Sequence, residues 1–399
     1  MGRLQAGASV DHQTDKPLRV VAQQPSLAKY RVPIFRELAS RPGIDFKLIY
    51  GERDGIPNVD PEGFTAEFVP MSSKRVLGRT MLWHAPQLEY ADQSKADVLT
   101  LSWDLHYASL VPALLKARQN GVGTVLWGHG YSKQDAGWRA KARYSVAKLA
   151  DALLFYNHKA AGAYVGAGFD PDRVFVALNA IDQSPIQAAR EQWVNEPTRI
   201  EDFRREQKLG DAPVLLFVSR LEETNRVDLL IEAQAKLSEA FPSLVVAVVG
   251  KGPDGERLES LATQRGLADR VRFLGAIYDE ERIAPWFMVS TAFCYPANIG
   301  LSILHGMGYG LPVVTSDKVE SQNPEIEALR DGENGFLYRD GDIDDLAAKL
   351  ELLLTDSATR NRMSAAAHAT ATERFSLANM VDGYVDAVRF AAGRAMDRR

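Results

Sequence analysis

The sequence has a single cysteine, Cys294, so it cannot form an internal disulfide. Cys294 lies within an apolar run, where its simplest explanation is a small buried hydrophobic residue. No apolar run reaches the roughly 18 residues that a membrane-spanning helix needs. The first twenty residues also lack the apolar core of a signal peptide. We therefore expect a reducing, cytoplasmic setting.

The sequence also lacks a strong excess of one charge. Its 399 residues carry a formal net charge of −5, which gives no overall attraction to nucleic acid. Hydrophobic residues make up 46% and charged residues 25%, as in a globular protein large enough for two apolar cores. We predict no nucleic-acid partner.

Short apolar runs alternate with helix-like segments along most of the chain. The expected strands of the N-terminal half are 18–22, 45–50, 66–69, 97–102, 123–127, 153–156 and 173–178. Those of the C-terminal half are 214–219, 244–249, 270–274, 291–295 and 312–315. This alternation predicts an α/β protein with parallel sheets and helices on both faces.

Two such halves, joined by a polar stretch at 183–210, predict two facing Rossmann-like domains with a ligand in the central cleft between them. We expect an N-terminal domain at 1–185 and a C-terminal domain at 186–375. A terminal helix at 376–399 is expected to pack back toward the N-terminal domain.

The stretch from Thr291 to Lys318 organises the predicted C-terminal domain. Two apolar runs flank a helix that opens at Gly300, Leu301 and Ser302, so the unit is β-α-β. Free N–H groups at such a helix start can bind an anion, and we expect the phosphates of the ligand here.

A glycine-rich turn follows the strand at 244–249. Gly250 and Gly252, with Pro253 next, match the spacing GxGxxG between a strand and a helix. A dinucleotide fold would also end its next strand with an acid, and VRFLG has none. The turn fits a close approach to a ligand and a simple tight turn equally well.

Two arginines follow the strand at 214–219. Arg220 and Arg226 fall where α/β domains bind ligands, and two cations there can neutralise a diphosphate leaving group. Alternatively, Arg226 is a solvated residue at a helix start and Arg220 pairs with Glu222 or Glu223. The spacing favours neither interpretation.

Other candidate groups lie outside these loops. His129 stands between glycines at a strand end, where its side chain can reach a ligand, although a polar loop histidine remains an alternative. Lys133–Lys148 is a basic segment that suits either solvent or an anionic membrane surface. Asp104 and His106 resemble a metal pair without a third ligand. The acids from Asp340 resemble a calcium loop, but Asp345 occupies the position that requires glycine, so we predict no metal site.

With these residues in view, the chain resembles the GT-B glycosyltransferases of family GT4. The resemblance runs from about residue 18 to the end and is more specific in the C-terminal half. The segments that carry it are VDLLIEA, VVGKGP, RVRFLG, GLSILHGMGYGLPVV and PEIEALRDGENGFLY, with AKYRVPIF, TVLWGHG and LNAID in the N-terminal half.

The resemblance implies transfer of a sugar from a nucleotide-diphosphate donor to a saccharide or lipid-linked acceptor in polysaccharide biosynthesis, with retained anomeric configuration and without a metal or other cofactor. It implies catalytic roles for Arg220, Arg226 and His129. The implied donor-binding residues are Asn225, Gly250, Gly252, Pro253, Phe273, Leu274, Gly300, Leu301, Ser302 and His305. The implied acceptor-binding residues are Tyr30 and Arg31.

The sequence departs from the family at its two-glutamate motif, because Ala297 and His305 stand at the two acidic positions. An imidazole still offers a hydrogen-bond donor and an acceptor to a ribose hydroxyl, whereas alanine cannot replace a carboxylate. This pattern resembles a variant subgroup. A sugar-nucleotide epimerase and a non-catalytic binding subunit therefore remain alternatives, with a dehydrogenase a distant one. A peripheral contact with the inner face of the membrane through Lys133–Lys148 would suit a lipid-linked acceptor.

Overall fold

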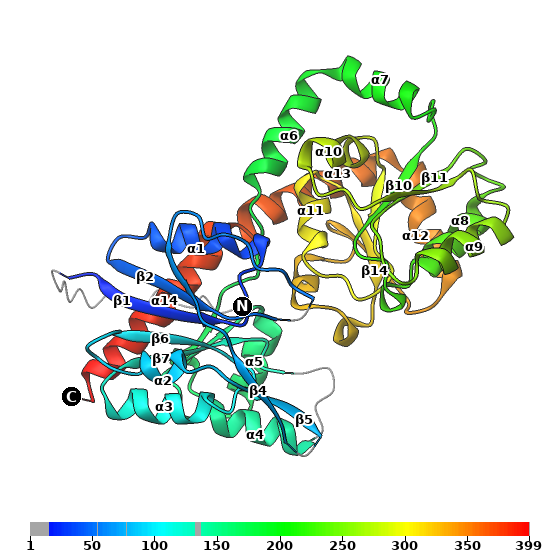
Figure 1. Cartoon of the computed structure of the whole chain (residues 1–399). Coiled ribbons are helices and arrows are strands. Elements are labelled where there is room, and N and C mark those ends of the chain that lie inside the picture. The colour runs from blue at the N-terminus through cyan, green and yellow to red at the C-terminus, as the bar shows by residue number, and fades with distance from the viewer. Residues whose placement is uncertain (1–15, 54, 77, 132–136, 399) are drawn as a thin grey trace. The chain divides into compact units, whose positions relative to one another are not determined.

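Figure 1 shows the computed structural model, which describes residues 16–398 except 54, 77 and 132–136. The chain forms two compact units. The first comprises Met1–Leu126, Lys148–Ala152 and Val388–Arg399, and the second comprises Trp127–Ala147 and Leu153–Ala387. The domain boundary that we expect after residue 185 falls inside the second unit, and it remains a prediction.

The first of two large sheets has seven strands in the order β3-β2-β1-β6-β7-β8-β9. β1 pairs in parallel with both β2 and β6, as the alternating sequence predicts. The strands are β1 (Leu18–Gln24), β2 (Ile44–Tyr50), β3 (Thr65–Phe68), β6 (Val98–Ser102), β7 (Gly123–Gly128), β8 (Ala152–Phe155) and β9 (Val174–Val176). The helices among them are α1 (Val32–Ala39), α2 (Pro86–Glu89), α3 (Leu110–Gln119), α4 (Gly137–Ala147) and α5 (His158–Gly166).

The second sheet has six strands in the order β12-β11-β10-β13-β14-β15. The strands are β10 (Val214–Val218), β11 (Val245–Val249), β12 (Val271–Gly275), β13 (Ala292–Cys294), β14 (Val313–Ser316) and β15 (Gly335–Tyr338). All five neighbouring pairs are parallel. Parallel strands that are buried on both faces have continuous apolar sequences, and VVAVV in β11 is buried throughout.

The helices that follow β9 include the polar connection that the sequence predicts. Those before the last helix are α6 (Ser184–Asn195), α7 (Pro197–Glu206), α8 (Val227–Leu237), α9 (Gly255–Gln264), α10 (Glu280–Met288), α11 (Ser302–Gly308), α12 (Ile343–Thr355) and α13 (Ser357–Ala369). α6 and α7 occupy that connection, and α8, α9 and α12 are among the helices that alternate with the strands, as the sequence predicts. Cys294 is buried in β13, as we expected.

The last helix, α14 (Leu377–Met396), packs closely against strands of the first sheet. A Cβ atom added to Gly383 would lie 2.1 Å from the carbonyl oxygen of Val176 in β9. One added to Gly123 in β7 would lie 2.5 Å from the carbonyl oxygen of Ala391. These two positions therefore need glycine because backbone approaches backbone there.

A two-stranded hairpin that the sequence reasoning did not predict follows β3. Its strands, β4 (Ser72–Val76) and β5 (Arg79–Trp83), pair antiparallel and form a sheet of their own (Figure 1). Every residue of β4 is exposed, so this strand adds nothing to an apolar core.

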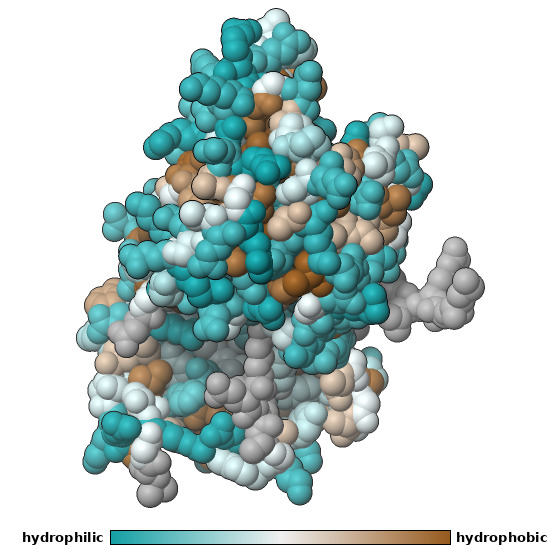
Figure 2. Space-filling model, turned by 90° about the vertical axis from the view of Figure 1, so that its right-hand side faces the viewer, coloured by the Kyte–Doolittle hydropathy of each residue, from teal (hydrophilic) through white to brown (hydrophobic). Residues whose placement is uncertain are grey.

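The surface is mainly polar on the face that Figure 2 shows, with small apolar patches scattered over it. Single apolar side chains on a surface are normal and need no special explanation. Within the described part of the chain, no helix combines the length and the apolar character needed to cross a membrane.

Candidate functional site

The carboxyl ends of β10 and β13 mark the point where the order of the second sheet reverses. From β10 the chain moves outward through β11 and β12, and from β13 it moves the other way through β14 and β15. Ligands of open α/β sheets bind at such a reversal, beyond the carboxyl ends of the strands. The loops after β10 and β13 supply Arg220, Asn225 and Asn298.

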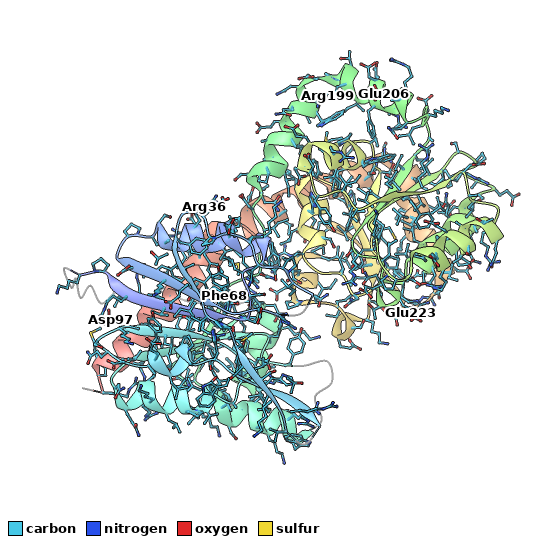
Figure 3. The ribbon with its side chains drawn as sticks, viewed as in Figure 1. Arg36, Phe68, Asp97, Arg199, Glu206 and Glu223 are labelled. Atoms are coloured by element: carbon cyan, nitrogen blue, oxygen red, sulfur yellow. The ribbon has the colours of Figure 1, made fainter. Side chains whose placement is uncertain are left out.

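Arg220 lies in the loop after β10 and is largely exposed. Its side chain is 68% exposed, and Nε lies 2.8 Å from Oε1 of Glu222, which confirms the alternative in which Arg220 pairs with Glu222. Glu223, labelled in Figure 3, begins the short 3-10 turn Glu223–Asn225 that ends this loop. Exposed ion pairs stabilise a protein by less than about 1 kcal/mol, so Arg220 can exchange Glu222 for a phosphate at little cost.

Asn225 joins the two loops through its side chain, which is almost fully buried. Its Nδ2 donates to the carbonyl oxygen of Arg220 at 2.7 Å, and its Oδ1 accepts from Nδ2 of Asn298 at 3.1 Å. The backbone N–H of Ala297 donates to the carbonyl oxygen of Asn225 at 3.3 Å. The network thus holds Ala297, at the first position where the resemblance implies an acid, next to the loop of Arg220.

Arg226 caps α8 from a left-handed backbone conformation, with φ of 53° and ψ of 41°. Its Nε and one terminal nitrogen each lie 3.2 Å from an oxygen of Asp228, and this carboxylate raises the pKa of the guanidinium. The Arg226 side chain is 42% exposed. Arg226 therefore lies beside Asn225 in sequence but is anchored by an acid of its own helix.

Gly250 and Gly252 let the loop after β11 pack against the loop after β10. A Cβ atom on Gly250 would lie 1.8 Å from the carbonyl oxygen of Ser219, and one on Gly252 would lie 2.1 Å from that of Leu221. Leu221 also donates its N–H to the carbonyl of Lys251 at 3.1 Å. The glycines are therefore required by contact with the protein's own backbone, whatever else binds there.

Phe273 and Leu274, near the end of β12, adjoin the same glycine turn. The N–H of Gly250 donates to the carbonyl oxygen of Gly275 at 2.8 Å, which ties the ends of β11 and β12 together. Phe273 and Leu274 are partly exposed beside the core of the second unit. Pro253 follows Gly252 in this turn, so these implied donor-binding residues do lie together at one edge of the sheet.

Gly300, Leu301 and Ser302 form the short entry to α11 after β13. A Cβ atom on Gly300 would meet the amide of Asn323 at 3.4 Å, an ordinary van der Waals distance. Asn323 in turn donates to the carbonyl oxygen of Asn298 at 3.0 Å. The segment before Pro324 thus supports the loop after β13, a role that the sequence reasoning missed.

His305, at the second position where the resemblance implies an acid, contacts a carboxylate that lies 25 residues earlier in the chain. Its Nε2 lies 2.9 Å from Oε1 of Glu280, and the hydroxyl of Tyr309 donates to the same oxygen at 2.5 Å. Phe287 stacks on Tyr309 with ring centroids 4.6 Å apart. Burial alone would raise the pKa of Glu280, but the bonds from His305 and Tyr309 outweigh it and leave this pKa below its usual value.

This arrangement fixes the chemical role of the His305 ring. An ionised carboxylate only accepts hydrogen bonds. Nε2 of His305 must therefore carry a proton and donate a hydrogen bond to Glu280. Nδ1 makes no hydrogen bond to any residue that the structure describes. Glu280 was missed because no pattern in its own segment marks it.

His129 is exposed at the end of β7, beside aromatic side chains of the second unit. Its ring centroid lies 4.9 Å from that of Tyr156 and 6.1 Å from that of Tyr131. Burial, followed by the negative charge of Glu325, raises the pKa of Tyr131. Glu325 is almost fully buried and accepts a hydrogen bond from Nδ2 of Asn179, so it is a second acid that the sequence reasoning missed.

Tyr30 and Arg31 belong to the first unit, in the 3-10 turn Lys29–Arg31. Tyr30 is exposed, whereas Arg31 is buried with its guanidinium carbon 5.3 Å from the centre of the Tyr30 ring. This stacking presents Tyr30 to solvent and holds Arg31 behind it.

The basic segment Lys133–Lys148 does not form one basic face. Lys133 lies outside the described residues, and Arg143 on α4 is buried. Lys141 and Lys148 are exposed, and Trp138 is 59% exposed. The segment therefore offers fewer exposed charges than its sequence indicates.

The acids that resemble metal ligands have other partners. Asp342 caps α12 by accepting from the N–H of Asp345, and Asp104 accepts from His106 at 2.6 Å. Among the described residues, no group of three or more His, Cys, Asp and Glu side chains is placed to hold a metal ion.

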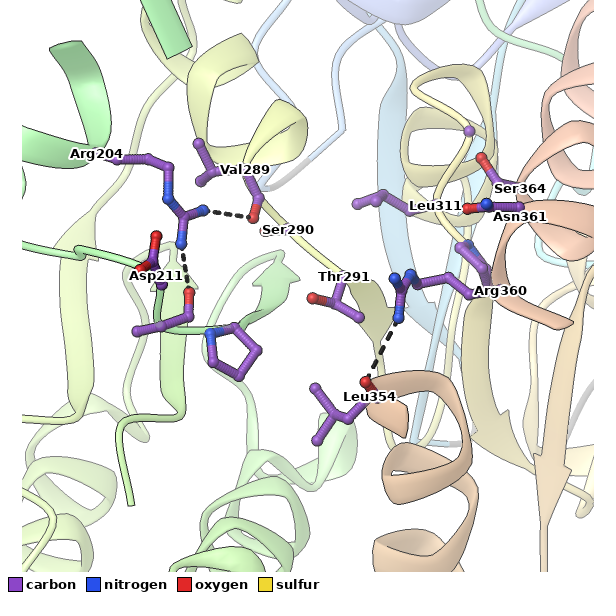
Figure 4. Close-up of a pocket in the computed structure, with 14 residues that line it drawn as sticks. Arg204, Asp211, Val289, Ser290, Thr291, Leu311, Leu354, Arg360, Asn361 and Ser364 are labelled. Carbon is purple, nitrogen blue, oxygen red and sulfur yellow. Dashed lines mark hydrogen bonds between the residues drawn. The ribbon is translucent and has the colours of Figure 1, made fainter. Parts of the chain in front are cut away.

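A cavity of about 410 Å³ lies at the opposite edge of the second sheet (Figure 4). It is lined by residues that precede β10, β13 and β14, together with Arg204 and Arg360. Arg204 donates to the carbonyl oxygens of Gly210 and Ala212, and Arg360 donates to that of Leu353 at the end of α12. Both arginines therefore have structural roles, and the cavity lies away from the loops described above.

The fold is GT-B, the two-sheet α/β fold of many glycosyltransferases. The chain is similar to the crystal structure of HepE from Anabaena in complex with UDP, with a TM-score of 0.69 and 18% identity over 94% of this chain and 99% of that one. It is also similar to a glycosyltransferase from Rickettsia africae, with a TM-score of 0.72 and 15% identity over 94% and 98% of the two chains. The predicted fold class is confirmed.

Within this fold, residues 198–370 match the family model described as glycosyl transferases group 1. The chain is 32% identical over 179 residues to the lipopolysaccharide core biosynthesis glycosyltransferase LpsE of Rhizobium meliloti, covering 44% of this chain and 49% of that protein. It is 34% identical over 216 residues to a D-inositol 3-phosphate glycosyltransferase of Thermomonospora curvata, covering 50% and 48%. The chain thus spans about half the length of these curated relatives.

Proposed function

We propose that this chain is a glycosyltransferase that moves a sugar from a nucleoside diphosphate to a saccharide or lipid-linked acceptor in polysaccharide biosynthesis. The observation behind the proposal is that hydrogen bonds link Arg220, Asn225 and Asn298 at the carboxyl edge of the second sheet. This edge lies within the segment that matches the group 1 family model. HepE, which shares the fold, was solved with UDP.

The donor would lie along the loops that end β10, β11, β12 and β13. Arg220 and Arg226 would face the diphosphate, because their present partners, Glu222 and Asp228, form solvent-accessible ion pairs that a phosphate can replace. The remaining proposed donor contacts lie in or beside the same loops; they are Asn225, Gly250, Gly252, Pro253, Phe273, Leu274, Gly300, Leu301 and Ser302.

The proposed reaction needs no metal and retains the anomeric configuration. The acceptor oxygen attacks the anomeric carbon from the face that the diphosphate leaves. The bond from that carbon to the phosphate oxygen breaks as the new glycosidic bond forms. The departing phosphate takes the acceptor's proton, and the two guanidinium groups stabilise the negative charge that develops on it.

Glu280 supplies, through His305, part of the negative charge that an acid at position 305 would bring to the nucleoside. We place His305 at the donor through Nδ1, which accepts from a hydroxyl of the nucleoside while Nε2–H stays bound to Glu280. A carboxylate thus acts through the imidazole in place of a direct contact. Ala297 has no such substitute, since its side chain is a methyl group.

Exposed side chains supply the proposed contacts with the acceptor, the donor sugar and the membrane. Tyr30 is exposed and supported by Arg31, which suits an acceptor surface in the first unit. His129 is exposed beside Tyr131 and Tyr156, and we assign it to the donor sugar. A peripheral membrane contact through Lys133–Lys148 is supported by the exposed side chains of Trp138, Lys141 and Lys148.

The test is release of nucleoside diphosphate from each common nucleotide sugar, with and without a polysaccharide or lipid-linked acceptor fraction, in EDTA. Release that depends on acceptor supports transfer, and NMR of the product decides between retention and inversion. Turnover without acceptor would favour an epimerase. Binding without any turnover would favour a non-catalytic subunit, the alternative that Ala297 prompts.

A further inference from the structure

The β4–β5 hairpin presents one face that mixes apolar and basic side chains. Lys74 pairs with Met81, Val76 pairs with Arg79, and Ser72 pairs with Trp83. Residues directly opposite on an antiparallel pair point to the same side, and alternate residues along a strand do likewise. These six side chains therefore share one face, and we call it the hairpin face.

The hairpin face is strongly exposed. Val76 is 46% exposed and Trp83 is 42% exposed, while Lys74 and Arg79 are also exposed. The hairpin is held at its base, where the N–H of Leu82 donates to the carbonyl of His106 at 2.7 Å and Tyr107 donates to the sulfur of Met71 at 3.3 Å. The hairpin face therefore groups an exposed tryptophan with Val76 and Met81 beside basic side chains, which distinguishes it from a single exposed apolar residue.

The charge of the hairpin has one sign. From residue 70 to residue 88 the sequence has no Asp or Glu, whereas Lys74, Arg75 and Arg79 are basic. Neither Lys74 nor Arg75 forms an ion pair with any residue that the structure describes. The whole chain has a net charge of −5, but the stretch 70–88 has a formal charge of +3, since it contains three basic residues and no acidic one.

We propose that the hairpin face docks the protein on an anionic lipid surface. Trp83, Val76 and Met81 would enter the headgroup layer, where tryptophan is favoured and apolar area is removed from water. The long side chains of Lys74 and Arg79 would reach past this layer to lipid phosphates. The complementary charge selects an anionic membrane over a neutral one.

The hairpin belongs to the first unit, whereas α4 and the donor loops belong to the second unit. Neither the transfer reaction nor a nucleotide is needed for the docking, so failure of one proposal leaves the other standing. The docking does suit the reaction, because a lipid-linked acceptor would be met at the same membrane.

The test is sedimentation of the full chain with vesicles of phosphatidylcholine alone and with added phosphatidylglycerol. We expect binding only to the anionic vesicles, weakened by salt. Lys74→Gln with Arg79→Gln should lower the vesicle partition coefficient about 25-fold, at roughly fivefold for each charge. Trp83→Ala should lower it as well. The matched control is Arg118→Gln with Arg394→Gln, which removes two exposed charges elsewhere in the first unit.

Each outcome decides the proposal. Equal binding to neutral vesicles, no binding to either kind, or an unchanged partition of the hairpin variants would overturn it. Loss of binding only in Lys141→Gln with Lys148→Gln would assign the contact to α4 instead. Because Arg79 has a further contact within the protein, Lys74→Gln alone is also measured, and each variant must keep the thermal midpoint of the wild type.

Discussion

Nε2 of His305 lies 2.9 Å from Oε1 of Glu280, so the residue at an expected acidic position is itself held by an acid from another helix. We predict that Glu280→Gln weakens nucleoside diphosphate binding up to about tenfold, because the imidazole loses its fixed proton position and one charged hydrogen bond. Calorimetric titration measures this. Glu281→Gln, an exposed neighbour, is the control and should bind as the wild type does.

Nucleotides that lack one ribose hydroxyl test the proposed contact of His305 more specifically. If Nδ1 of His305 meets a ribose hydroxyl, the wild type should prefer the ribonucleotide over the 2′-deoxy or 3′-deoxy analogue. His305→Ala should lose that preference, since removing the imidazole and removing the ribose hydroxyl delete the same contact. An equal preference in both proteins would place His305 outside the nucleoside site.

Arg220→Ala should abolish most turnover while leaving the fold unchanged. The side chain is 68% exposed, and Glu222 is its only ion-pair partner among the residues that the structure describes, so the free energy of unfolding should change by less than about 1 kcal/mol. Loss of a guanidinium that stabilises the leaving group should lower kcat roughly 10²- to 10³-fold. Arg330→Ala, which breaks a similar exposed pair with Glu333, is the control. Retained activity in Arg220→Ala would remove Arg220 from the mechanism.

The glycine turn after β11 gives a stability prediction. Gly250→Ala should destabilise the protein by at least about 2 kcal/mol, because its Cβ would lie 1.8 Å from the carbonyl oxygen of Ser219 and its φ of 153° disfavours a side chain. Gly162→Ala on α5 meets nothing within 4 Å and should be neutral or slightly stabilising. Urea denaturation compares the two, and equal stability would contradict the observed packing.

His84 gives the pH prediction. Its ring is fully buried, and although a hydrogen bond from Nε2 to the carbonyl of Val69 opposes the effect, burial lowers its pKa. The unfolded chain then takes up the proton first, so the stability that neutral His84 contributes is present above a pH of about 6.5 and falls as the pH drops toward the folded pKa. Denaturation at pH 7.5 and pH 5.5 should show a smaller loss for His84→Gln than for the wild type. A parallel loss in both would contradict this.

The sheets could be predicted from the sequence because buried parallel strands have continuous apolar runs, as in Val245–Val249. The hairpin could not, since SSKRV and RTMLW mix basic, polar and apolar residues without burying a face. The pairing of Arg220 with Glu222 was one of two alternatives that spacing left open.

Residues of the candidate site could be predicted where they lie in a single loop. They could not be predicted where two segments that are distant in the sequence meet. Arg220 follows a strand, so its sequence position marked it, whereas Asn225 in the same loop was implied by the resemblance to GT4. Glu280 reaches His305 only because the residues that follow β12 and β13 come together, which no local pattern reveals. Glu325 meets Asn179 across 146 residues for the same reason.

The most direct test of the account is calorimetric titration of the full chain with UDP, GDP and ADP, in EDTA, beside the Arg220→Ala variant. We predict that one nucleotide binds the wild type and that the variant binds it at least about tenfold more weakly, since a charged hydrogen bond to phosphate is lost. At 100 times its dissociation constant, that nucleotide should add about 2.7 kcal/mol to the free energy of unfolding. Binding of none of the three, or equal binding by the variant, would contradict a nucleotide-sugar site at the ends of β10 and β13.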